Sequence, residues 1–109
     1  MYIDFELAIQ NYDVIELRWP VAFGRMNSSA YQALADALEP VPGVNRVEVL
    51  RYSAHVEIAA HVQNLVSVLE DIREYVLEDP QLKAELAAVG VTNYGVTVCP
   101  DVVTRRLVP

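Results

Sequence analysis

Apolar and polar residues alternate in five segments of the chain, which is the pattern of strands with one buried face. The first two segments cover residues 2–9 and 14–19, and a short polar connection of turn-forming residues joins them. Three further segments cover residues 44–52, 54–60 and 91–98, with the chain reversing near Tyr52-Ser53. The pattern therefore predicts five strands, with the first two and the next two joined as hairpins.

Helical spacing of apolar residues separates these strands. A helix over residues 29–39 is predicted from a capping box of Ser29 and Gln32, followed by an apolar stripe. The most regular stripe begins at Val62 and comprises Val62, Leu65, Leu69, Ile72 and Val76. Asp79-Pro80 then supplies the cap and first residue of a short second helix, which Gly90 ends.

This order of elements predicts an α+β fold. It matches a ferredoxin-like βαββαβ sandwich preceded by one extra N-terminal strand, with an antiparallel sheet and helices on one face. We expect a single domain over residues 1–109, with an N-terminal hairpin in 1–20, the βαββαβ core elements in 27–98 and a tail in 100–109. The pattern leaves open whether strand 2–9 pairs within the chain or with a second copy.

Two motifs at the first helix resemble those of a known family. Gly24-Arg25-Met26-Asn27-Ser28-Ser29-Ala30 precedes the helix, and Pro42-Gly43-Val44-Asn45-Arg46-Val47-Glu48-Val49 follows it. Over residues 14–58 the chain resembles heavy-metal-associated domains, which have a ferredoxin-like fold. Asn27 and Ala30 occupy the positions at which that family has its two metal-binding cysteines. The resemblance therefore implies the family's architecture without its thiolate metal site.

Composition limits the possible partners. The chain has 15 acidic and 8 basic side chains and a net charge of −7, so we expect no nucleic-acid binding. An apolar content of 53% predicts a folded domain, yet no apolar run is long enough to span a membrane. A single cysteine, Cys99, and an N-terminus without signal-peptide features favour the cytoplasm.

Few residues indicate chemistry. His55 and Glu57 lie two residues apart on a predicted strand and share a face, so with His61 they are candidate metal ligands. A continuous strand would separate His55 from His61 by about 20 Å, which favours solvated side chains instead. An enzyme with His55 as base ranks last, because no nucleophile, acid and oxyanion donors can be placed together. We therefore predict no catalytic residue, no cofactor and no enzyme.

Two groups of residues are candidate interaction surfaces. The sheet face without helices is expected to carry Arg46, Glu48, Leu50 and Tyr52, as a wet surface or a sheet-to-sheet interface. The long helix carries the acidic residues Glu70, Asp71, Glu74 and Glu78. These form either a solvated face or a docking surface for a basic patch.

The sequence thus favours a small non-catalytic protein-interaction or regulatory module, either homodimeric or bound to another protein. A small acidic chain of this kind also fits an accessory factor of a virus or mobile element that acts on a host protein. The alternative is a small-ligand or metal-binding domain, using the loop at residues 24–29 or the pair His55 and Glu57.

Overall fold

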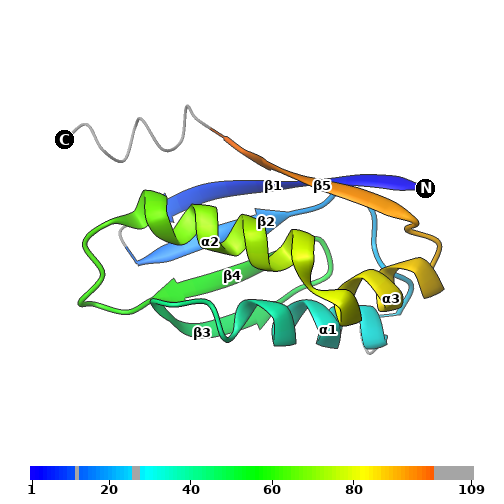
Figure 1. Cartoon of the computed structure of the whole chain (residues 1–109), viewed down its shortest axis with the longest axis horizontal. Helices are drawn as coiled ribbons and strands as arrows, with labels where there is room; N and C mark the ends of the chain where they lie inside the picture. The colour runs from blue at the N-terminus through cyan, green and yellow to red at the C-terminus, as the bar shows by residue number, and fades with distance from the viewer. Residues whose placement is uncertain (12, 26–27, 100–109) are drawn as a thin grey trace.

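The computed structural model describes residues 1–11, 13–25 and 28–99, so Asn27 and the predicted tail at 100–109 lie outside the described residues. Within these described ranges, three helices cover one face of a five-stranded sheet (Figure 1). The elements are β1 (Tyr2–Asn11), β2 (Val14–Arg18), α1 (Ser29–Leu38), β3 (Val44–Val49), β4 (Ser53–Ile58), α2 (Leu65–Glu78), α3 (Pro80–Ala88) and β5 (Asn93–Val98). The predicted α+β class is confirmed.

The sheet has the strand order β3-β4-β2-β1-β5. β1 pairs within the chain and lies between β2 and β5, with Leu7 opposite Leu17 on one side and Val98 on the other. The β1–β2, β2–β4 and β3–β4 pairs are antiparallel, whereas β1 and β5 are parallel. The expected fully antiparallel sheet is therefore wrong at one pair. β1 lies between β2 and β5 and is antiparallel to β2. Because β5 also runs antiparallel to β2, it must run parallel to β1.

Alternation along the strands separates a buried face from an open one. On β1 the side chains of Ile3, Phe5, Leu7 and Ile9 are at most 1% exposed, and they pack beneath the helices. The helices contribute buried side chains at helical spacing, namely Leu34, Leu38, Leu69, Ile72, Val76, Leu82 and Leu86. No buried polar or charged residue occurs within the described ranges. Each large apolar side chain contributes about 1.5–3 kcal/mol by leaving water.

The helix starts agree with the sequence in one case and differ in two. Asp79 caps α3 as predicted, because its Oδ1 accepts a hydrogen bond from Leu82 N at 2.9 Å. The capping box on α1 is wrong: Ser28 precedes the helix, and its Oγ donates to the carbonyl of Phe23 at 3.0 Å. α2 begins at Leu65 because Asn64 caps it through a 3.2 Å bond from Ser67 N.

Candidate interaction surface

The turn between β3 and β4 exposes two large apolar side chains. We name its residues, Leu50, Arg51 and Tyr52, the Arg51 turn. Leu50 is 39% exposed and Tyr52 is 52% exposed. The sequence placed both side chains on the open sheet face, but β3 ends at Val49, and they extend from the turn instead. A 2.7 Å bond from Leu50 N to the carbonyl of Ser53 closes the turn.

Three hydrogen bonds from distant residues hold the backbone of the Arg51 turn. The carbonyl of Arg51 accepts from Trp19 Nε1 at 2.8 Å and from the Tyr31 hydroxyl at 2.9 Å. In addition, Trp19 N donates to the carbonyl of Tyr52 at 3.0 Å. Because both side-chain donors are only 4% exposed, the turn is fixed to the core rather than to solvent.

The donors belong to a buried aromatic cluster. The Trp19 ring stacks on the Phe23 ring with centroids 5.1 Å apart. The Tyr31 ring also contacts Phe23, with a centroid distance of 5.1 Å. The Tyr31 hydroxyl also accepts from Phe23 N at 3.0 Å, and Phe5 meets Trp19 edge to face. Ring packing therefore fixes both donors that reach Arg51, and the turn needs little ordering on binding.

Two exposed side chains of the turn, Arg51 and Tyr52, are of types that contribute most binding energy at protein interfaces. The Arg51 guanidinium lies over the Tyr52 ring, 5.9 Å from its centroid. Tyr and Arg are enriched among interface hot spots, and a rigid backbone reduces the entropy lost on association. The turn therefore combines exposed Tyr and Arg side chains with a rigid backbone.

The open face of the sheet carries a network of charged side chains centred on Glu16. The Glu16 carboxylate accepts from Gln10 Nε2 at 2.8 Å and lies 3.4 Å from Arg18 Nε. His55 Nε2 lies 3.1 Å from the other carboxylate oxygen, and His55 Nδ1 lies 4.0 Å from Glu48. Register places Glu16, His55 and Glu48 in one row across β2, β4 and β3, so this face is polar and internally paired.

The candidate metal ligands do not converge. His55 and Glu57 share the open face, as predicted, where they line a shallow hollow of about 140 Å³ with Val14, Arg46 and Glu48. His61 lies in the loop after β4 and is exposed. Within residues 1–11, 13–25 and 28–99, no three His, Cys, Asp or Glu side chains are placed to hold a metal ion.

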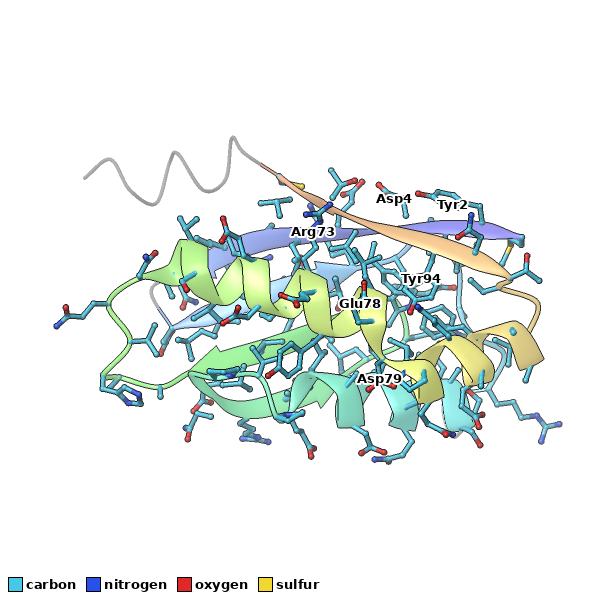
Figure 2. All side chains as sticks on the ribbon, in the orientation of Figure 1. Tyr2, Asp4, Arg73, Glu78, Asp79 and Tyr94 are labelled. Carbon is cyan, nitrogen blue, oxygen red and sulfur yellow. The ribbon has the colours of Figure 1, made fainter. Side chains whose placement is uncertain are left out.

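The acidic residues of α2 differ in exposure and in the groups that lie near them. Glu70, Glu74 and Glu78 are exposed, and Asp71 is half-buried. Asp79 follows them as the cap of α3, so the negative charge at the end of α2 also lies at the start of α3, where the helix dipole favours it. Figure 2 shows Glu78 and Asp79 beside Tyr94, whose hydroxyl donates to the carbonyl of Val76 at 2.6 Å. Burial raises the pKa of Tyr94 to about 12, and the negative charges of Asp79 and Glu78 add to the effect of burial.

Sequence reasoning missed the centre of the site, the carbonyl of Arg51. A partial signal exists in Trp19 and Tyr31, since a buried indole N–H or phenol hydroxyl needs a hydrogen-bond partner. The partner lies 32 residues from Trp19 and 20 from Tyr31, and only the folded sheet brings them together.

Comparison with known proteins gives no family for the chain. No protein-family model matches the sequence, and no curated protein or solved structure matches it. Among the described residues, the helices are too short or too polar to cross a membrane.

Proposed function

We propose that the chain is a small non-catalytic protein-interaction module that presents the Arg51 turn to another protein. The observation that supports this function is the combination of exposure and rigidity at the turn. Leu50 and Tyr52 are solvent-exposed, yet the backbone between them accepts two hydrogen bonds from buried aromatic residues. An exposed apolar pair on a fixed backbone suits recognition, because little conformational entropy is lost on binding.

The charge distribution favours a partner over a catalytic role. On the open face the Glu16 carboxylate contacts Arg18, His55 and Gln10, which gives a paired polar surface beside the apolar turn. An apolar contact point with a polar surround is the usual anatomy of a protein interface. A second copy of the chain and a larger protein, including a host protein targeted by a viral or mobile-element factor, are the two kinds of partner proposed.

The same proposal extends to the architecture. We interpret β2, α1, β3, β4, α2 and β5 as a ferredoxin-like unit whose sheet is opened to admit β1 between β2 and β5. In such a unit one sheet face lacks helices and is available for contacts, and the Arg51 turn lies at the end of β3, next to that face.

The test is quantitative affinity capture from extracts of the source cell with the full chain as bait. We expect a captured protein to be reduced at least tenfold with a Leu50→Ser, Tyr52→Ala bait, because truncating a hot-spot Tyr costs about 2 kcal/mol or more and tenfold corresponds to about 1.4 kcal/mol. Tyr2→Ala is the matched control, since Tyr2 is exposed to a similar extent, 58% against 52%, but lies on β1.

Size-exclusion chromatography with light scattering distinguishes the two kinds of partner. A homodimer formed through the turn becomes monomeric in the double variant and stays dimeric in Tyr2→Ala. A strictly monomeric wild-type chain that retains no protein contradicts the proposal.

A further inference from the structure

Among the strands that the structure describes, β5 forms one edge of the sheet. Its only neighbour among the described strands is β1, and Cys99 N donates to the carbonyl of Leu7 at 2.8 Å. Successive residues of a strand direct their backbone groups to opposite sides, so the N–H and C=O groups of Tyr94, Val96 and Val98 point away from β1. A row of outward backbone groups is a template for another strand.

A groove runs along this edge between β5 and α2. One stripe of α2 lines it with Val66, Leu69, Glu70 and Arg73, residues that share a helix face by their spacing. Val96, Thr97 and Val98 form the other wall, and the groove has a volume of about 440 Å³. We name this space the β5 groove. It places an apolar surface directly beside the outward backbone groups of the strand.

Arg73 already uses one of these backbone groups. Figure 2 shows it reaching from α2 to β5, where its Nε donates to the carbonyl of Val96 at 3.3 Å. The contact demonstrates that this carbonyl is directed into the groove and accepts a donor arriving from that side. An added strand would supply a backbone N–H in place of the guanidinium.

The apolar wall of the groove and the acidic side chains of α2 favour one kind of occupant. Its apolar wall includes Val66, which is 37% exposed, and α2 as a whole carries four acidic residues against the single basic Arg73. Glu70 lies on the groove wall, and Glu74 follows one turn later on the exposed surface. An extended segment with β-branched apolar residues and Arg or Lys satisfies both the backbone edge and the charge. A helix would leave the edge groups unpaired.

We propose that the β5 groove binds an extended basic segment of a partner protein, which joins the sheet as a further strand beside β5. This site is separate from the Arg51 turn, and its test uses other residues, so either proposal can fail alone.

The first test measures fluorescence anisotropy of a labelled synthetic peptide of alternating Val and Arg residues with the full chain. Val66→Arg and Glu70→Arg should each weaken binding of the peptide about tenfold. The first variant obstructs the apolar wall of the groove, and the second reverses a charge on that wall. Val89→Arg and Glu39→Arg are matched controls, since Val89 is 39% exposed and both lie on other surfaces. These controls should change binding less than twofold. No binding at about 1 mM peptide, or equal loss in the controls, overturns the proposal.

The second test is amide hydrogen exchange at Val96 and Val98 in the full chain. The peptide should slow exchange at these two amides about tenfold, as expected for new ladder hydrogen bonds, and a peptide with Pro in place of Val should not. Amides already protected without peptide show that another occupant covers the edge and overturn the proposal. Protection that increases with protein concentration assigns that occupant to a second copy, and constant protection assigns it to residues 100–109 of the same chain.

Discussion

The two faces of the sheet are built from the same strands but differ in how they contribute to the stability of the fold. Leu17 on the covered face is fully buried, whereas its neighbour Glu16 on the open face is held by Arg18, His55 and Gln10. The covered face gains free energy from area removed from water, and the open face exchanges hydrogen bonds with water for hydrogen bonds between side chains. Stability therefore depends mainly on the covered face, and the open face contributes less.

The largest effect should follow truncation on the covered face. Leu17→Ala leaves a cavity beneath the helices and should lower the free energy of unfolding by about 2–5 kcal/mol. Urea unfolding followed by circular dichroism measures the change. A loss under about 1 kcal/mol would contradict the assignment of Leu17 to a tightly packed core.

A smaller effect is expected at Tyr94, at the β5 end of the covered face. Tyr94→Phe removes the hydrogen bond to Val76 and should cost about 1 kcal/mol at neutral pH. Its pKa is raised from 10.0 to about 12, so the unfolded chain releases the phenol proton first. The contribution is complete below pH 10 and is lost as the pH rises toward 12.

Urea unfolding at several pH values between about 9 and 12 separates this titration from others. Tyr94→Phe should flatten part of the decline in stability over that range, whereas Tyr52→Phe, at an exposed position, should leave the decline as in the wild type. Equal slopes in the wild type and Tyr94→Phe would refute the link to Tyr94.

The open face should respond weakly to a change next in sequence to Leu17. Glu16→Gln keeps the shape of the side chain but removes the charge facing Arg18 and His55, and should cost about 0.5–1 kcal/mol. The difference should shrink in about 1 M salt, because exposed charges are screened. A cost above about 2 kcal/mol in urea unfolding would place Glu16 among the determinants of the fold.

The smallest change in stability is expected at the Arg51 turn. Tyr52→Ala should alter the free energy of unfolding by less than about 0.5 kcal/mol, because the ring is exposed and the hydrogen bonds that fix the turn are accepted by backbone carbonyl groups. Trp19→Phe removes one of the two donors to Arg51 and should cost more, about 1–3 kcal/mol. Thermal unfolding of both variants tests this order, and the reverse order would show that the turn is held by its own side chains.

The sequence predicted the parts of the fold that depend on local pattern. Alternation located the strands, and Asp79-Pro80 located the start of α3, because capping involves residues three positions apart. The capping box failed because α1 already begins at Ser29 and the Gln32 amide donates to Asp36 one turn later, a competition that spacing does not reveal. The position of β1 between β2 and β5 depends on pairings across the whole chain.

The candidate sites were predictable to a lesser extent. The shared face of His55 and Glu57 follows from strand period, and the exposure of Glu70 and Glu74 follows from helical period. The Arg51 turn and the β5 groove do not follow from either. The Arg51 turn depends on hydrogen-bond donors 20 and 32 residues away in the sequence. The β5 groove depends on which strand lies at the sheet edge beside α2.

The parallel pairing of β1 with β5 also affects how the protein is made. β1 can form its hairpin with β2 as soon as both leave the ribosome, but its partners on the other side follow 91 residues later in the sequence, as in the pair Tyr2 and Asn93. Until then the backbone edge of β1 at Ile3, Phe5 and Leu7 stays unpaired in a nascent chain that already carries its most apolar strand. Folding that waits for a contact so distant in sequence is slow, and a chain interrupted before β5 presents an aggregation-prone edge.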